Sequence, residues 1–315
     1  MVNQILIIQQ NIFRKLTLFL VLFVFPYSTF SQEWNKPYRF TFGVQSSNYS
    51  YREFIPSLDK KSDSEIMNIQ GIMTGVNGTI EYIAIKKIVF GLNAQYSYGI
   101  LHYSSNFYRI YCFDSYIAST ITETDIRDHL FETKVNIGYS TNFLGFECIP
   151  KLGFAFRYLY DNQQEAKLSG FVLERNTFPQ VNKLNSKAYN RISRYLYIPI
   201  GFNLTKIISD KWSSSFGFEF DYFIKGWQSS FLSEADTNMI NIRNNQTKGF
   251  GLHTSLSLTR LINETMHISI VPFINLWKIE KSDQVKFFKD PLDKRTGNEP
   301  KNTTFNIGLS LKIEM

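Results

Sequence analysis

Segments in which apolar and polar residues alternate strictly recur from residue 38 to the C-terminus. The clearest spans 215–225, SFGFEFDYFIK, where even-numbered positions are apolar and odd-numbered positions are mostly small or charged. Successive side chains of a strand point to opposite faces, so such a segment has one apolar face and one polar face. That pattern is typical of membrane-spanning β-barrels, whose outer face contacts lipid and whose interior is polar.

We predict ten strands, at 38–52, 67–82, 88–103, 128–140, 146–160, 187–204, 211–228, 246–259, 265–279 and 300–313. Each reaches the roughly 9–11 residues that a tilted strand needs to cross a bilayer. The connections alternate between short ones, near 83–87, 140–145, 205–210 and 260–264, and long ones, near 53–66, 104–127, 161–186, 229–245 and 280–299. Because periplasmic turns are short and extracellular loops are long in this class, we predict an all-β fold. It is a ten-stranded antiparallel transmembrane β-barrel with short periplasmic turns and long extracellular loops.

The N-terminal segment has the features of a signal peptide. A basic pair precedes an apolar run at 16–25, and the small residues Thr29 and Ser31 fit the −3 and −1 positions of a cleavage site. The run is too short for a membrane-spanning helix, which needs about 20 apolar residues. We therefore predict a signal peptide at 1–31, a single barrel domain at 32–315 and a location in the outer membrane.

The composition limits the partners. The net charge of +7 falls to +5 without the first 31 residues, because only Arg14 and Lys15 are lost, and this mild excess does not indicate nucleic acid. We expect a monomer whose partners are outer-membrane lipid and the barrel assembly machinery, with small solutes or surface ligands at the loops as further candidates. Cys112 and Cys148 are not expected to pair, since a strand crossing separates them. No Cys or His spacing predicts a metal or cofactor site.

The same alternation predicts which charged side chains enter the lumen. The predicted network contains Glu81, Glu132, Lys134, Lys151, Arg157, Glu219, Asp221 and Lys225. Buried charges need partners, so we expect cross-strand ion pairs. Barrels of about eight strands are filled by their own side chains, and wide aqueous lumens occur at about 16 strands. The network of a ten-stranded barrel therefore either fills the lumen or lines a small pore.

No catalytic residue is predicted, but three candidates remain. Asp128 lies where the fourth strand begins, beside His129, yet alternation points Asp128 inward and His129 outward. Asp221 and His253 face the lumen on adjacent strands, where they could form a cross-strand pair. Such a pair is either one link of the interior network or a catalytic dyad or pH-sensitive gate.

Several short segments resemble known outer-membrane proteins. Residues 48–53 and 73–78 are similar to the opening strands of uncharacterised outer-membrane β-barrel families, as are 221–226 and 299–304 to later parts. These families imply the barrel fold and offer no catalytic residues. The strand count also resembles the omptins, ten-stranded outer-membrane proteases with paired aspartates and an Asp/His pair at the rim. The sequence does not match those motifs.

These features indicate a passive outer-membrane protein with a structural or surface role, or porin-like passage of small solutes. The alternative is an omptin-like protease or a lipid-modifying enzyme at the extracellular rim, and a third possibility is a soluble secreted β-protein. Many outer-membrane barrels end on an aromatic residue that the assembly machinery reads. This chain ends on Met315, so we predict a variant signal.

Overall fold

A computed structural model describes residues 37–56, 63–84, 87–111, 116–163, 167–174, 186–187 and 189–315. The predicted signal peptide, 1–31, and Cys112 lie outside these residues, and Cys148 is a free thiol. Within the described ranges, no helix is long and apolar enough to cross a membrane.

Ten long antiparallel strands form the wall of the barrel in the described part of the chain. They are β1 (Tyr38–Pro56), β2 (Asp63–Ile83), β3 (Ile88–Tyr111), β4 (Tyr116–Tyr139), β6 (Phe146–Asn162), β9 (Arg191–Ser209), β10 (Trp212–Ser230), β12 (Gly249–Asn263), β13 (Met266–Ile279) and β16 (Lys301–Glu314). Each predicted strand corresponds to one of these. The predicted ten-stranded antiparallel barrel is therefore confirmed.

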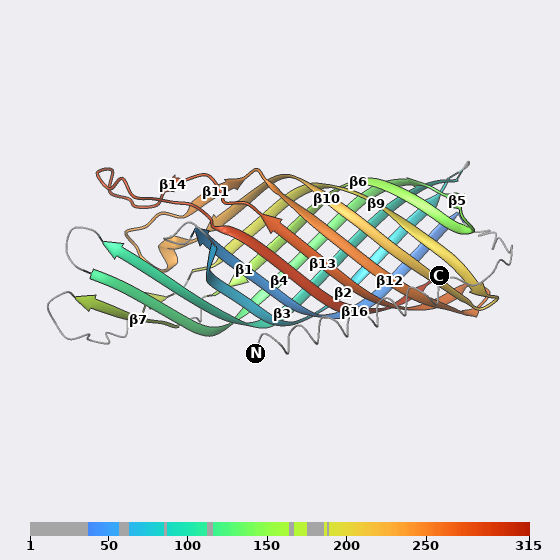
Figure 1. Ribbon diagram of the computed structural model, residues 1–315, viewed down its shortest axis with the longest axis horizontal. Coiled ribbons are helices and arrows are strands. Elements are labelled where there is room, and N and C mark those ends of the chain that lie inside the picture. Colours follow the sequence, from blue (N-terminus) through green and yellow to red (C-terminus); the bar gives the residue numbers. More distant parts are fainter. Residues whose placement is uncertain are drawn as a thin grey trace. The chain divides into compact units, whose positions relative to one another are not determined.

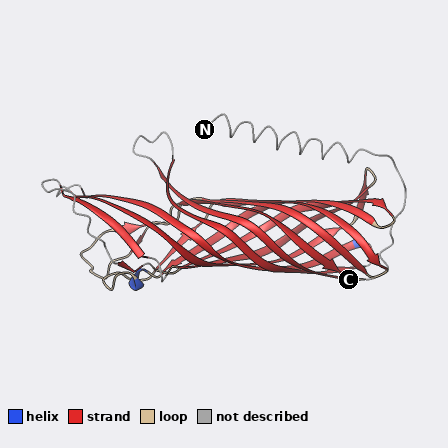
Figure 2. Cartoon of the chain, turned by 90° about the horizontal axis from the view of Figure 1, so that it is seen from below, coloured by secondary structure: helices blue, strands red, loops and turns tan. Residues whose placement is uncertain are grey.

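The first and last strands close the sheet on itself. β1 pairs with β16 from Thr41 opposite Glu314 to Phe54 opposite Lys301, and neighbouring strands are inclined to the barrel axis (Figures 1 and 2). Closure leaves no unpaired edge in the wall, which a sheet exposed to lipid requires because unpaired backbone groups are costly there.

The extracellular end carries more strand than we predicted. The expected loop at 104–127 is wrong for most of its length, because β3 and β4 stay paired as far as Tyr111 and Tyr116. Segment 116–127 is rich in Thr and Ile, which favour strands even where the pattern of a lipid-facing strand ends. β7 (Lys167–Glu174) pairs with this part of β4 and extends the wall (Figure 1).

Shorter elements occupy the remaining connections. β5 (Thr141–Phe143) pairs with β6 at a periplasmic turn, and β8 (Ser186–Lys187) pairs with β7. The 3-10 helix η2 (Leu232–Glu234) and β11 (Ile242–Gln246) lie between β10 and β12, and β11 pairs with β10. β14 (Val285–Lys286) and β15 (Thr296–Gly297) form a small hairpin before β16.

The outer face has an apolar band. On β1 the outward residues at even positions 38–44 are aromatic or aliphatic and exposed, whereas those at 46–52 are polar. Exposed Tyr82, Tyr139 and Trp212 lie at the periplasmic strand ends, where aromatic side chains anchor a barrel in the bilayer interface. This band identifies the membrane-spanning part and excludes a soluble β-protein, which would not expose so large a continuous apolar surface.

The interior changes character halfway along the barrel. On β9 the inward residues at odd positions 191–199 are buried, and those at 201–207 are partly exposed. On β12 the inward residues at 253–259 also keep accessible surface. We call the exposed part, near the short turns, the lower lumen, and the buried part, toward the long connections, the upper lumen. A hydrophobic cluster fills the upper lumen, formed by Tyr49, Tyr51, Met67, Ile69, Met73, Leu101, Ile126, Leu130, Ala155, Leu159, Tyr195, Tyr197, Phe223, Trp277 and Ile279.

Candidate functional site in the barrel lumen

One ion pair near the periplasmic end crosses the lumen, and two others join neighbouring strands. Lys151 Nζ on β6 lies 3.1 Å from Glu81 Oε1 on β2. Arg39 on β1 approaches Glu81 at 3.4 Å and Glu314 at 3.7 Å. All four side chains keep some accessible surface, so this group of charges lies in the lower lumen.

A second polar group lies at the boundary between the two halves. Lys134 on β4 forms ion pairs with Glu132, at 3.1 Å, and with Glu219 on β10. Glu219 is directly opposite His253 of β12 in the sheet register, and Asp221 follows on the same face of β10. The Nε2 atom of His253 lies 2.5 Å from Oδ2 of Asp221. Strand register and a contact across the lumen therefore gather three acids, a lysine and a histidine.

Trp277 of β13 covers this boundary group from above. Its ring packs edge-on against Tyr197, with centroids 4.8 Å apart, and against His253 at 5.9 Å. The guanidinium of Arg157 lies 5.1 Å from the centroid of the Trp277 ring. A small cavity adjoins the ring and is lined by Gln95, Leu130, Glu132, Arg157, His253, Asn275, Trp277, Thr304 and Asn306.

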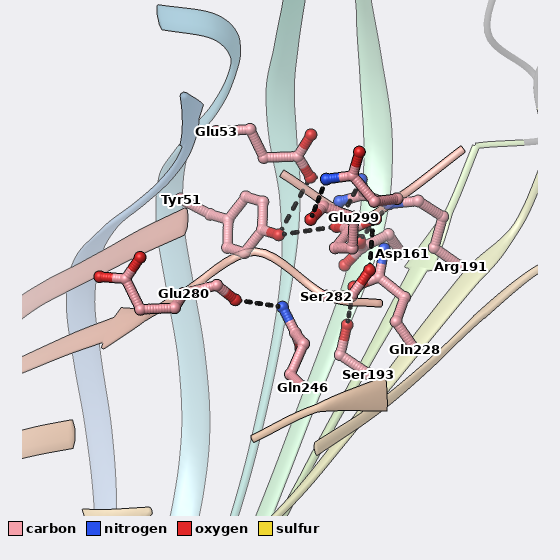
Figure 3. Close-up of polar contacts among 11 residues, drawn as sticks. Tyr51, Glu53, Asp161, Arg191, Ser193, Gln228, Gln246, Glu280, Ser282 and Glu299 are labelled. Carbon is pink, nitrogen blue, oxygen red and sulfur yellow. Dashed lines mark hydrogen bonds and ion pairs between the residues drawn. The ribbon is translucent and has the colours of Figure 1, made fainter. Parts of the chain in front are cut away.

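The upper lumen contains a buried arginine surrounded by acids. Arg191, at the start of β9, contacts Glu53 of β1 at 2.6 Å, Asp161 of β6 at 2.9 Å and Glu299 at 3.6 Å. The Tyr51 hydroxyl donates a hydrogen bond to Glu53 at 3.0 Å, and the guanidinium of Arg191 lies over the Tyr51 ring. Figure 3 shows these side chains converging from several strands.

The arginine contacts cross the barrel. In the ring of ten strands, β1 and β9 are separated by four strands on either side, so Arg191 and Glu53 come from opposite walls. A second layer of hydrogen bonds supports them: Ser193 donates to Gln228 at 2.9 Å, and the backbone of Glu299 donates to Ser282 at 2.7 Å. Side chains from opposite walls therefore meet at this level of the lumen.

The acids around Arg191 are not equivalent. Glu299 precedes β16 and lies beyond the apolar band. Burial raises the pKa of Glu299 well above its ordinary range, the charge of Glu53 raises it further, and Arg191 opposes both effects. Burial disfavours the charged form of a carboxyl, and one guanidinium does not compensate three carboxylates fully. Glu299 is therefore the acid of this cluster whose ionisation costs most.

Seven of the eight predicted lumen charges lie on the inner face, and Lys225 does not. The pairing of β10 with β9 shifts between Phe223 and Lys225, a β-bulge that inserts one residue. Beyond a bulge the alternation is reversed, so Lys225 lies exposed on the outer face, with its ammonium 5.4 Å from the Trp227 ring centroid. The prediction that Lys225 joins the lumen network is wrong for this reason.

The three catalytic candidates lie inside the lumen and not at an exposed rim of the barrel. Asp128 points inward as predicted and is buried directly opposite Asp161 in the register of β4 and β6. His129 faces outward, where its Nδ1 lies 2.7 Å from the Tyr96 hydroxyl. Asp221 and His253 lie together, but at the boundary level beneath Trp277. The structure thus brings together Asp221 and His253, and separates Asp128 from His129.

Sequence reasoning missed the centre of the upper lumen. Arg191 shares its inward parity with Tyr195 and Tyr197, so alternation along β9 could have identified it. Glu53 and Glu299 lie just outside the predicted strands, in the predicted loops at 53–66 and 280–299. No local signal marks Glu299 as a lumen residue, because its position depends on how the connection before β16 folds back.

A group of basic residues lies on the outer face just beyond the apolar band. Arg243 and Lys225 approach the Trp227 ring, at 5.3 and 5.4 Å from its centroid, and Arg194 pairs with Trp227 across the sheet. Arg194 donates a hydrogen bond to Ser229 at 3.3 Å. Within the described part of the chain, none of these three cations forms an ion pair with a carboxylate.

No protein-family model and no curated protein matches the sequence. Among solved structures, the chain is similar to the outer membrane protease OmpT of Escherichia coli, with a TM-score of 0.58 and 9% identity over 91% of this chain and 98% of that one. The translocator domain of the autotransporter NalP of Neisseria meningitidis matches with a TM-score of 0.39, 9% identity and 89% of each chain. At these identities the likeness concerns the fold alone, and of these two matches we base the fold comparison on that to OmpT.

The predicted resemblance to outer-membrane β-barrels is therefore confirmed. The fold also confirms the predicted location in the outer membrane. A closed antiparallel barrel with an apolar exterior band and OmpT-like architecture is the fold of a bacterial outer-membrane protein.

Proposed function

We propose that this protein is a closed outer-membrane barrel with a structural or attachment role at the cell surface, and that it has no standing pore. The observation that carries the proposal is the contact between opposite walls in the upper lumen, where Arg191 reaches Glu53. The hydrophobic cluster continues this closure down to Trp277, which is 1% exposed. A diffusion channel needs a continuous polar path, and buried aromatic rings across the lumen are the opposite arrangement.

The extracellular end supports a surface role. β3, β4 and β7 continue beyond the apolar band as paired strand, which holds residues far from the membrane without a separate domain. Binding and recognition residues are commonly presented on connections that a rigid scaffold positions. In this proposal the barrel is the anchor and the extension is the part that meets other molecules.

The burial of the catalytic candidates argues against an enzyme at the extracellular rim. Asp128 and Asp221 are 3% and 0% exposed, and the upper lumen separates His253 from the extracellular side. A general base must come within hydrogen-bonding reach of its substrate, and a peptide or lipid has no path to these side chains from outside. The fold shared with OmpT does not by itself transfer a protease activity.

We propose that the partners of the barrel are outer-membrane lipid and the assembly machinery. The outward cations Arg194, Lys225 and Arg243 suit the anionic headgroups of outer-membrane lipid, because each faces the level where headgroups begin. We further propose that the barrel is a monomer that the assembly machinery inserts through a variant C-terminal signal ending in Met315.

The proposal can be tested by single-channel recording of the refolded mature chain in a planar bilayer. We expect no steady current from a barrel whose folding is verified by its shifted gel mobility before boiling. The double variant Tyr195→Ala/Trp277→Ala removes two rings from the upper lumen and should conduct. Phe273→Ala, a ring removed from the partly exposed lower lumen, should stay silent.

A steady wild-type current that changes when Lys134, Lys151 or Arg157 is neutralised would contradict the proposal. The protein would then be a porin-like channel for small solutes, and the charges at the boundary would be its filter.

A further inference from the structure

We propose that Glu219, Asp221 and His253 bind a divalent transition-metal ion of the Zn²⁺ class at the top of the lower lumen. One carboxylate oxygen of each acid and one imidazole nitrogen lie within 4.8 Å of one another. This inference concerns the boundary group, and it does not depend on the role proposed for the extracellular end.

The site follows from strand geometry. Glu219 and Asp221 are two residues apart on β10, so both point inward, and His253 is the cross-strand partner of Glu219 on β12. Two paired strands therefore supply all three ligands without any contribution from a loop. The strands also pair with β9 and β13, which fixes the positions of the ligands in the sheet.

The strongest indication is a buried carboxylate oxygen that has no partner. Asp221 is 0% exposed, and its Oδ1 atom accepts no hydrogen bond from a described residue. The Nε2 atom of His253 lies 2.5 Å from the other oxygen, Oδ2, and forms an ion pair with it when the imidazole is protonated. Unsatisfied buried polar atoms are rare in native proteins, and an ion is one of the few explanations for them.

The surroundings hold the acids in place and leave a route to the site. Gly251 lies opposite Asp221 in the register, and a Cβ there would come within 2.6 Å of Oδ2, so the absence of a side chain makes room for the carboxylate. Lys134 contacts Oε1 of Glu219 and leaves Oε2 for a ligand. The side chains of Glu219 and His253 are 29% and 14% exposed, so the site meets the accessible part of the lumen.

The donor atoms indicate the class of ion. Two carboxylates and an imidazole form a mixed N/O set, which suits Zn²⁺ and related transition metals and leaves a fourth position for water. Ca²⁺ takes six to eight oxygen ligands and is poorly served by three donors that include a nitrogen. The sequence did not suggest this site because its ligands follow no Cys/His spacing and meet only through the register of two strands.

The competing explanation is an ion pair between protonated His253 and Asp221, with no metal. We would refold the mature chain in detergent, strip it with a chelator and titrate it with Zn²⁺ by calorimetry. We expect one equivalent to bind, and Ca²⁺ to give no binding. Asp221→Asn and His253→Gln should each weaken Zn²⁺ binding by more than the roughly 10–100-fold typical of losing an outer-shell partner. Glu81→Gln, which removes another lumen carboxylate, is the matched control and should bind Zn²⁺ as wild type does.

A second measurement needs no variant. Co²⁺ added to the stripped wild type should give the visible absorption bands of a low-symmetry N/O site, and Zn²⁺ should abolish them. Absence of these bands and of a calorimetric signal in folded wild type would overturn the proposal and leave the ion pair. Zn²⁺ binding of equal strength in Asp221→Asn and His253→Gln would overturn it as well, because the ion would then lie elsewhere.

Discussion

The upper and lower halves of the lumen are built from the same ten alternating strands, yet their charged side chains differ in exposure to solvent. In the lower lumen, Lys151 and Glu81 pair at 3.1 Å with 19% and 12% of their side chains exposed. In the upper lumen, Arg191 is 5% exposed and is held among Glu53, Asp161 and Glu299. One half is partly solvated, and the other is packed like the core of a soluble protein.

The difference shows which contacts maintain the closure. A pair that keeps access to solvent gains little, because water competes with the partner and returns when the pair is broken. Water cannot replace a lost partner in a buried cluster, so removing one member leaves the charges of the others buried and uncompensated. The closure should therefore depend on a few residues of the upper lumen, while the lower lumen should tolerate change.

The largest effect is expected for Arg191→Ala. The substitution leaves three buried carboxylates without their cation, and breaking a buried pair in this way costs about 3–5 kcal/mol. Lys151→Ala, which breaks the lower pair with Glu81, should cost less, because both side chains keep some contact with the solvent of the lower lumen. Urea unfolding of both variants in detergent micelles, followed by tryptophan fluorescence, measures the two costs side by side.

Equal costs at Arg191 and Lys151 would contradict the division of the lumen into two halves. A third variant, Arg191→Lys, keeps the charge and loses the forked contacts with Glu53 and Asp161. It should fall between wild type and Arg191→Ala, which separates the contribution of charge from that of geometry.

Much of the barrel could be predicted from alternation because the membrane imposes it. Lipid on one side and a polar interior on the other repeat the same two-residue pattern in every strand, as in segment 215–225. The short turns were located for the same reason, since each interrupts the pattern. The ends of β3 and β4 were missed because strand there continues beyond lipid, where nothing requires an apolar outer face.

The candidate site was less predictable because it depends on contacts between strands distant in sequence. Alternation along a strand predicts that Asp221 and His253 point into the lumen. It does not predict how deep either residue lies relative to Trp277. It also cannot detect a β-bulge, which is why Lys225 was placed on the wrong face. The partners of Arg191 come from opposite walls of the barrel, and only closure of the sheet brings them together.

A smaller effect, dependent on pH, is expected at Glu299. Burial and Glu53 raise its pKa in the folded barrel above the ordinary value of about 4.3. Its contribution to stability is therefore complete below that value and is lost as pH rises through the folded-state pKa. While Glu299 is protonated in the folded state only, the loss approaches about 1.4 kcal/mol per pH unit.

Glu299→Gln should remove this dependence. The variant should match wild type in acid and become the more stable of the two as pH rises, when urea unfolding is measured over a series of buffers. Glu147→Gln, at the periplasmic end and far from Arg191, is the matched control for the same exchange outside the cluster. A Glu299→Gln curve parallel to that of wild type would mean that the upper lumen does not disfavour this carboxylate.

The smallest effect is expected at Lys225, and it tests whether this side chain lies outside the lumen. On the outer face this side chain contributes an exposed cation–π contact with Trp227, worth about 0.5–1 kcal/mol. Lys225→Ala should therefore change the free energy of unfolding by no more than that amount and leave bilayer conductance as in wild type. Lys134→Ala, whose side chain does enter the lumen and joins Glu132 to Glu219, should cost several times more. A Lys225→Ala variant as unstable as Lys134→Ala would mean that the ammonium lies inside the barrel. It would also contradict the bulge between Phe223 and Lys225, because this residue points inward only if the alternation is uninterrupted.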